Sequence, residues 1–331
     1  MNAGERAIAK EQKRLEKERK RRIELANKML IPVGGKTKES LKLLAFDPEG
    51  VFRFEDNRWL KVYEIVGAYS GLADVTADVL GRMRITFYLS ENGRETCHLT
   101  LMETGEIYEE IRQKIAADES VLAKVCELKP LNVDETMNQI AANFCQDLRF
   151  SYASFVRGKK DWKKECFFEA ECEEESFKVG RIHGQVLGVL EFPKEVKRDL
   201  ISNLKELSCP MFVSLDLNGL TEEEQLNFKR ALEKKFNRRL PLNEAEEFIN
   251  LSLSITLLCD SKDARRIVKE TLVLLLLQEG FVTAPCFLSQ NQALESGLSL
   301  GFSDYTVTRN VSIELAQQML GGKSHDAKEQ I

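Results

Sequence analysis

The sequence predicts an α+β fold of two sub-domains with mainly antiparallel sheets, preceded by a charged helical arm. Three observations support this prediction. Residues 1–28 contain ten Lys or Arg and five Glu, and residues 9–22 contain neither glycine nor proline. Within residues 45–150, the elements from 59 to 117 follow the order β-α-β-β-α, which is typical of an antiparallel sheet with helices on one side. Residues 151–320 repeat a strand–helix rhythm.

Size and composition exclude several classes of protein. A chain of 331 residues, 43% hydrophobic and 31% charged, is typical of a soluble globular protein with room for two domains. The longest apolar run, Leu272 to Leu277, is far shorter than the ~20 residues of a membrane-spanning helix. The charged N-terminus does not fit a secretory signal. The eight cysteines contain no C-x-x-C pair. We therefore expect reduced thiols in a cytoplasmic protein.

The N-terminal arm and linker, residues 1–44, differ in charge from the rest of the chain. Residues 1–28 carry a net charge of +5, whereas the whole chain carries −5, so residues 29–331 hold about −10. Apolar residues in the arm are too sparse for a coiled-coil seam. We expect a solvated helix that does not pack on the body. Its charge fits either a solubilising tail or contact with anionic lipid or nucleic acid, and the interleaved glutamates favour the tail.

The first sub-domain is expected at residues 45–150. In chain order, its expected elements are strands at 51–54 and 59–66, a helix at 72–80, strands at 85–89 and 97–101, and helices at 104–117 and 137–148. The dipeptide Asn92-Gly93 indicates a two-residue hairpin turn, because both positions favour positive φ. The charge-dense stretch 152–176 fits a β-hairpin or a loop, and it marks the boundary between the sub-domains.

The second sub-domain is expected at residues 151–320, followed by a disordered tail at 321–331. In chain order, its expected elements are a strand at 186–192, a helix at 196–207, a strand at 212–217, a helix from Thr221, a strand at 251–257, a helix at 264–275 and a strand at 281–287. Thr221 and Glu224 form a capping box for the fourth of these. The order predicts a ferredoxin-like (split βαβ) sheet with a helical insertion.

The strand at 251–257 has the clearest pattern of the second half. Leucine or isoleucine occupies every odd position, and Ser252, Ser254 and Thr256 occupy the even ones. A period of two predicts a half-buried strand whose serine face meets solvent. We expect Leu253 and Ile255 to face the core opposite Leu215, under Leu272 and Leu275 of the following helix.

One motif suggests nucleotide binding. Gly34-Gly35-Lys36-Thr37 supplies the lysine, the hydroxyl and one glycine of a P-loop. The first glycine of that motif would stand at position 30, which is Leu30, and no apolar strand leads into the loop. We therefore interpret the segment as a flexible linker and expect no cofactor-binding residues.

The remaining candidates for chemistry are scattered, and we expect no catalytic or metal-binding residues and no cofactor. The three histidines are too far apart for most zinc sites, and the acidic run lacks the glycine-broken loop of a calcium site. The glycines at four-residue spacing fit strand packing better than phosphate binding. The residues weighed are His98, His183, His325, Cys166, Cys172, Glu171, Glu173, Glu174, Glu175, Gly180, Gly184 and Gly188.

Two stretches carry a family resemblance. The first comprises Phe46-Asp47-Pro48-Glu49-Gly50-Val51 and Trp59-Leu60-Lys61-Val62-Tyr63-Glu64-Ile65. The second runs from Gln290 to Gly301 and is followed by Thr308-Arg309-Asn310-Val311-Ser312. They resemble the N-terminal, non-ATPase region of the CagE/TrbE/VirB family, the conjugation and type IV secretion ATPases. Ser299 stands where that family has a proline.

The resemblance implies a scaffold role but no enzymatic activity. Family members continue into a P-loop ATPase domain beyond the point that corresponds to Ile331, so their Walker motifs match nothing here. In the family, this region contacts membrane-embedded secretion subunits and neighbouring ATPases. The implied function is a non-catalytic interaction protein of a conjugative DNA-transfer apparatus, cytoplasmic or peripheral to the inner face of the membrane. No small-molecule substrate is expected. The alternative is a nucleic-acid-binding accessory factor that uses the basic arm.

Overall fold

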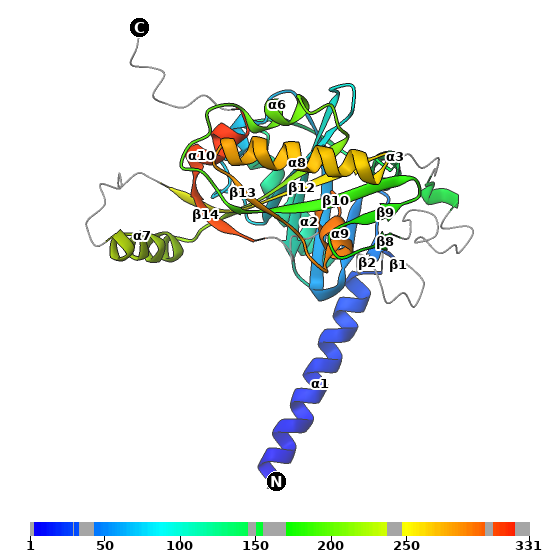
Figure 1. The fold of residues 1–331 in the computed structure, drawn as a ribbon. Coiled ribbons are helices and arrows are strands. Elements are labelled where there is room, and N and C mark those ends of the chain that lie inside the picture. Colours follow the sequence, from blue (N-terminus) through cyan, green and yellow to red (C-terminus); the bar gives the residue numbers. More distant parts are fainter. Residues whose placement is uncertain are drawn as a thin grey trace.

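The computed structural model describes residues 3–28, 30–32, 43–144, 150–154, 170–236, 247–301 and 307–321. The strands in these ranges form one 14-stranded sheet, and every strand pairing in it is antiparallel. Helices pack on both faces of this sheet (Figure 1). The predicted α+β class with mainly antiparallel pairing is therefore confirmed.

The first half of the sheet is centred on strand β4. Its elements are β1 (Ile31–Pro32), β2 (Leu43–Phe46), β3 (Val51–Phe54), β4 (Arg58–Val66), β5 (Arg82–Leu89), β6 (Glu95–Thr104), α2 (Tyr108–Leu122), β7 (Glu127–Pro130) and α3 (Val133–Ala142). The strand order is β7-β4-β6-β5. Strand β3 pairs with the N-terminal half of β4 and β7 with its C-terminal half, both on the edge opposite β6.

The second half repeats this arrangement around strand β10. Its elements are β8 (Glu171–Cys172), β9 (Phe177–Val179), β10 (Ile182–Glu191), α6 (Leu200–Lys205), β11 (Met211–Gly219), α7 (Glu222–Phe236), β12 (Phe248–Cys259), α8 (Lys262–Gln278), β13 (Val282–Pro285), α9 (Gln290–Gly297), β14 (Arg309–Ser312) and α10 (Ile313–Met319). The order is β13-β10-β12-β11, and β9 and β13 share one edge of β10. Each half thus has the same strand order.

The two halves join where β5 pairs with β11. Ile85 lies opposite Leu215, and the antiparallel register runs from Met83↔Leu217 to Leu89↔Met211. Because β5 and β11 hold the same place in their halves, their antiparallel pairing approximates a two-fold relation. The sub-domains expected at 45–150 and 151–320 therefore share one continuous sheet. Their independence as folding units stays a prediction.

The two faces of the sheet differ in chemistry. On one face, odd-numbered residues of β5, β11 and β12 pack with α2, α6, α8 and α10 into an apolar core. Leu253 pairs with Leu215, and Leu272 is fully buried in the same core, as predicted, whereas Leu275 is only partly buried and Leu276 takes the second core position of α8. The expectation of a solvent-facing serine face on β12 is wrong, because Ser254 is only 5% exposed. Helices α3 and α9 cover that second face.

Two local predictions are corrected by hydrogen bonding within the chain. No α-helix forms at 72–80. The segment contains a short 3₁₀ helix, η2 (Ser70–Leu72), followed by i→i+3 turns, and Thr76 Oγ1 donates to Leu72 O at 3.1 Å. Such hydroxyl bonds compete with helix formation.

The hairpin at Asn92-Gly93 is confirmed, but its loop is longer than two residues. The Ser90 amide donates to the carbonyl oxygen of Arg94, and of Asn92 and Gly93 only Gly93 has a positive φ, +74°.

The basic arm is helix α1 (Ala3–Ala26), and it projects away from the sheet (Figure 1). The expectation that the arm does not pack on the body is wrong for the C-terminal end of the helix and the residues just after it. Arg19 pairs with Glu106 at 2.7 Å, and Asn27 accepts the amide of Tyr108, the first residue of α2, at 3.0 Å. Leu30 is buried in the core. In the described ranges, no helix combines the length and apolarity that crossing a bilayer requires.

Candidate functional site

The turn between β2 and β3 is the first half of the stretch that carries the family resemblance. Asp47 closes it: its Oδ1 accepts the amide of Val51 at 2.9 Å, and its carbonyl oxygen accepts the amide of Gly50 at 3.2 Å. Gly50 has φ +83°, and a Cβ there would lie 2.3 Å from the carbonyl oxygen of Leu131. The aspartate and the glycine are therefore both required by the backbone of this turn.

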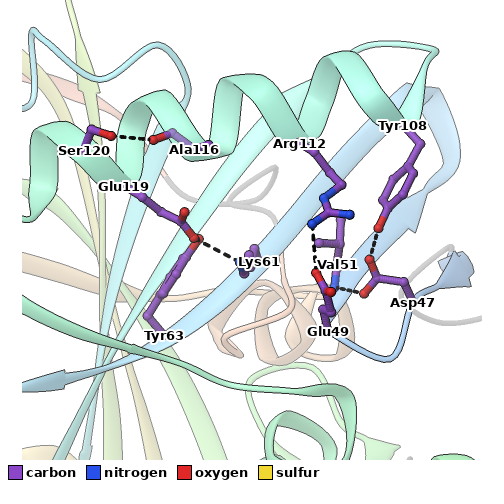
Figure 2. Close-up of polar contacts among 10 residues, drawn as sticks. All are labelled: Asp47, Glu49, Val51, Lys61, Tyr63, Tyr108, Arg112, Ala116, Glu119 and Ser120. Carbon is purple, nitrogen blue, oxygen red and sulfur yellow. Dashed lines mark hydrogen bonds and ion pairs between the residues drawn. The ribbon is translucent and has the colours of Figure 1, made fainter.

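Side chains of the turn hold the N-terminal end of α2. Tyr108 donates its hydroxyl to Asp47 Oδ2, and Arg112 Nη2 lies 3.1 Å from Glu49 Oε2 (Figure 2). The Tyr108 ring packs on Trp59, with ring centroids 5.8 Å apart. Burial, and then the Asp47 carboxylate, raise the pKa of the Tyr108 hydroxyl above its usual range. The hydroxyl therefore stays protonated and keeps donating.

A second cluster lies further along the same strand and helix. Glu119 of α2 accepts from Lys61 Nζ at 3.0 Å and from the Tyr63 hydroxyl at 2.7 Å, both from β4 (Figure 2). Burial is the main cause that raises the pKa of Tyr63, followed by the charge of Glu119. The lysine neutralises the glutamate, so the cluster joins α2 to the sheet without leaving a net charge.

A groove of about 700 Å³ opens beside Tyr63 and Glu119. Its walls come from Tyr63, Glu119, Ala123, Val125, Cys126, Glu127, Leu128 and Pro130. Burial raises the pKa of Cys126 to about 11, so its thiol is protonated near neutral pH. Tyr63 is held protonated and Glu119 is paired. At neutral pH the groove thus presents a protonated thiol, a protonated tyrosine hydroxyl and a paired carboxylate.

The second stretch of the resemblance crosses the face of the sheet that α3 and α9 cover. We call it the polar face, because the central strands bury polar side chains there, among them Arg84, His98 and Ser214. Ser299, fully buried, hydrogen-bonds the Tyr88 hydroxyl at 2.5 Å and His98 Nδ1 at 3.1 Å, and its carbonyl oxygen accepts from Thr100. Gln290 bonds both the amide and the carbonyl oxygen of Val186 in β10. The segment from Gln290 to Gly301 therefore works as a strap across both halves of the sheet.

A buried ion pair lies under this strap. Arg84 of β5 meets Asp216 Oδ1 of β11 at 2.8 Å, and Arg84 Nη1 donates to the carbonyl oxygen of Leu298 at 3.0 Å. Ser214 donates to the carbonyl oxygen of Gly297 at 2.6 Å. Backbone carbonyl oxygens of the strap thus accept hydrogen bonds from Arg84, Ser214 and Thr100, which helps these polar side chains to be buried there.

The histidine in this network is kept neutral. Burial lowers the pKa of His98 to about 4. Burial also raises the pKa of Tyr88 to about 12, although its bond to Ser299 opposes that change. At neutral pH both groups therefore act as uncharged hydrogen-bonding groups that hold the strap, which is a structural role.

Three glutamates of the acidic run at 171–175 form ion pairs with lysines. Ion pairs join Lys178 to Glu171 at 3.9 Å, Lys262 to Glu173 at 2.5 Å and Lys269 to Glu175 at 3.5 Å. No group of three or more His, Cys, Asp or Glu is placed to hold a metal ion in the ranges that the structure covers. Lys178 pairs within the β8–β9 hairpin, whereas Lys262 and Lys269 tie that hairpin to α8, much as Arg112 and Tyr108 tie the β2–β3 turn to α2.

The remaining histidine, cysteine and glycine candidates lie apart from one another. His183 lies half-buried on β10, far along the chain from His98, and Cys172 is exposed on β8. A Cβ at Gly184 would strike the ring of Phe177 at 2.0 Å, which fits the expectation that this glycine relieves packing. The segment 34–37, Cys166 and His325 lie outside the described residues.

The side chains that hydrogen-bond Asp47, Glu49 and Lys61 all lie on α2 and were not among the residues expected from the sequence to form a site. Tyr108, Arg112 and Glu119 all project from one side of α2 toward β2–β4 (Figure 2). Their spacing of four and seven residues places them on one helix face, and that spacing could have indicated a polar seam.

No family model matches the chain. No curated protein matches it either.

Proposed function

We propose that this protein is a non-catalytic interaction protein of a conjugative DNA-transfer (type IV secretion) apparatus, a counterpart of the N-terminal region of its ATPase. The supporting observation is the position of the residues that resemble that family. Asp47, Glu49 and Lys61 hold α2 on the sheet, and Gln290 and Ser299 hold the strap across it. Residues used to fix a scaffold fit a protein that presents surfaces to partners.

The proposal extends to the fold and its place in the cell. We infer that each half of the sheet is a ferredoxin-like unit, and the shared orders β7-β4-β6-β5 and β13-β10-β12-β11 support this. The proposed location is the cytoplasm, at the inner face of the membrane, where the membrane-embedded subunits of such an apparatus would be contacted.

The function is tested by transfer and by association. Deleting the gene from its mobile element should lower the frequency of conjugative transfer, and the full chain should restore it. The tagged protein should also co-purify with named subunits of the same apparatus. An unchanged frequency of transfer in the deletion strain would contradict the proposal.

The absence of ATPase activity is a separate prediction. Leu30 stands where a P-loop needs its first glycine, and in this structure Leu30 is part of the apolar core. The purified chain should neither bind ATP at micromolar concentration nor hydrolyse it. Calorimetric titration checks this prediction. A micromolar affinity that Lys36→Ala abolishes would contradict it.

An alternative function is favoured by α1. This helix projects from the body, and its exposed residues include Lys13, Lys17 and Arg21 (Figure 1). A nucleic-acid-binding accessory factor would use such an arm on phosphates. Binding to duplex DNA should then weaken steeply with salt, because phosphate contacts release counterions.

Charge-matched variants separate the two functions. Lys13→Gln, Lys17→Gln and Arg21→Gln together should reduce both affinity and the salt slope if the arm binds DNA. The same charge change on exposed residues of the body, at Lys194, Lys197 and Arg198, serves as the control. Equal weak binding by both triple variants would reject the alternative.

A further inference from the structure

Two thiols face each other at one end of the β11–β12 pair. Cys259 is the last residue of β12, and Cys209 lies two residues before β11. The register Met211↔Leu257 is extended by a bond from Leu258 N to the carbonyl oxygen of Pro210 at 2.9 Å. One further step places Cys209 opposite Cys259. Their sulfur atoms are 3.6 Å apart.

The backbone at this point suits a covalent bridge. The pair Pro210–Leu258 occupies a hydrogen-bonded position, so the next pair occupies a non-hydrogen-bonded one, where facing Cα atoms lie about 4.5 Å apart. Disulfides span Cα separations of about 4.4–6.8 Å. Bridging therefore requires the side chains to close the gap between the sulfurs, with little movement of the strands.

The two thiols differ in reactivity. Either sulfur can donate in the hydrogen bond between them; with Cys209 as the donor, this bond lowers the pKa of Cys259, burial opposes the change, and the charge of Arg265 supports it. The same contact raises the pKa of Cys209. Cys259 is therefore the sulfur that carries thiolate character, and thiolate is the attacking form.

Cys209 lies in the short loop between α6 and β11. Cys209 and Cys259 are 7% and 6% exposed. Ser208, next to Cys209, has φ +47°, a left-handed conformation that is strained for a residue other than glycine. The exchange proposed below therefore requires this short loop to open around Cys209.

We propose that Cys209 and Cys259 are a redox-modifiable pair that forms an intrachain disulfide by exchange with a small disulfide such as oxidised glutathione. Cys259 thiolate attacks one sulfur of the glutathione disulfide, a mixed disulfide forms, and one glutathione thiolate leaves. Cys209 then loses its proton and attacks the Cys259 sulfur, which releases the second glutathione. Two protein thiols are oxidised and one glutathione disulfide is reduced to two thiols.

The test is peptide mapping of the native full chain after incubation with oxidised glutathione. After alkylation of the remaining thiols and trypsin digestion without reductant, residues 206–229 should be linked to residues 240–262 in most molecules. Glutathione addition at exposed Cys172 confirms that the reagent was active. The linked peptide should disappear on addition of a thiol reductant.

Single variants test the order of the steps. Cys209→Ser should accumulate glutathione on Cys259, because the resolving thiol is missing, whereas Cys259→Ser should leave Cys209 largely unmodified. The control Cys97→Ser should not change the yield of linked peptide. Cys97 lies in the core, and burial raises its pKa.

Two results would overturn the proposal. One is full modification of Cys172 in the native wild-type chain with Cys209 and Cys259 still reduced. The other is a linked peptide that forms only when urea has unfolded the chain, since the pair would then depend on random encounter rather than on the native geometry.

Discussion

At the scale of single residues, burial decides how much an apolar side chain contributes to the free energy of unfolding. Ile255 is fully buried among residues of the main core, whereas Ile267 on α8 is 58% exposed. Truncating a buried isoleucine removes its transfer free energy and leaves a cavity.

The first prediction compares these two isoleucines. Ile255→Ala should lower the free energy of unfolding by about 2–5 kcal/mol, and Ile267→Ala by less than about 0.5 kcal/mol. Urea denaturation of both variants measures the difference. Equal losses at the two positions would mean that β12 does not carry the core.

The second prediction concerns the hydroxyl that holds the β2–β3 turn. Tyr108→Phe leaves buried Asp47 Oδ2 without its donor, and this should cost about 1.5–3 kcal/mol. Arg112→Ala removes the ion pair between Arg112 and Glu49. The two side chains are 46% and 62% exposed, so this change should cost less than about 1 kcal/mol. A larger loss for Arg112→Ala, again from urea denaturation, would reverse the assigned roles.

At the scale of elements, the contact of α2 with β6 contains two carboxyl groups. Asp118 of α2 accepts the amides of Leu80 and Gly81 at 2.7 and 3.2 Å, and Glu103 of β6 is 4% exposed. Burial first, and then the hydrogen bond and charge of Asp118, raise the pKa of Glu103 to about 7. Lys114 opposes this change. Glu103 is therefore largely protonated in the folded state at weakly acidic pH.

The third prediction is a pH dependence of stability. Because the folded pKa of Glu103 is above its unfolded value, its contribution is fully present below about pH 4.5 and is lost as pH rises through about 7. The wild-type free energy of unfolding should fall by up to about 3 kcal/mol between pH 4.5 and 8 through this group. Glu103→Gln should remove that part of the slope. A slope that is identical in wild type and Glu103→Gln would disprove the assignment.

At the scale of the whole molecule, the two halves are joined by the β5–β11 pairing and by the strap over it. Arg84 belongs to the first half, Asp216 and Leu298 to the second, and the ion pair between Arg84 and Asp216 is buried. Removing one partner leaves a buried charge without compensation, which costs about 3–5 kcal/mol. A change in one half should therefore destabilise the other.

The fourth prediction tests this coupling. In a Trp162→Phe background, Trp59 is the one remaining tryptophan, and it reports on the first half alone. Asp216→Asn, in the second half, should lower the urea midpoint seen by Trp59 fluorescence as much as the midpoint seen by circular dichroism. The control Glu64→Gln, which breaks an exposed pair with Lys129, should move neither midpoint appreciably. An unchanged Trp59 transition in Asp216→Asn would mean that the halves unfold independently.

Local patterns in the sequence determined most elements of the second half. The alternation at 251–257 lies within β12, and the capping box at Thr221 is present, with the Thr221 amide donating to Glu224 at 2.8 Å. The Asp47–Gly50 turn could likewise be expected from the sequence, because an aspartate that bonds its own backbone and a glycine at positive φ are local requirements. Short-range periodicity and turn chemistry act within a few residues, so they can be read directly from the chain.

Contacts between residues far apart in the chain determine which surfaces meet. Ile85 pairs with Leu215 across 130 residues, and Tyr108 reaches Asp47 across 61. The serines of β12 have the pattern of a solvent face, yet Ser254 is buried because the strap covers that side of the sheet. Periodicity separates two faces of a strand but does not state what covers each one. Polar side chains can be buried wherever distant backbone carbonyls accept their hydrogen bonds, as Gly297 does for Ser214.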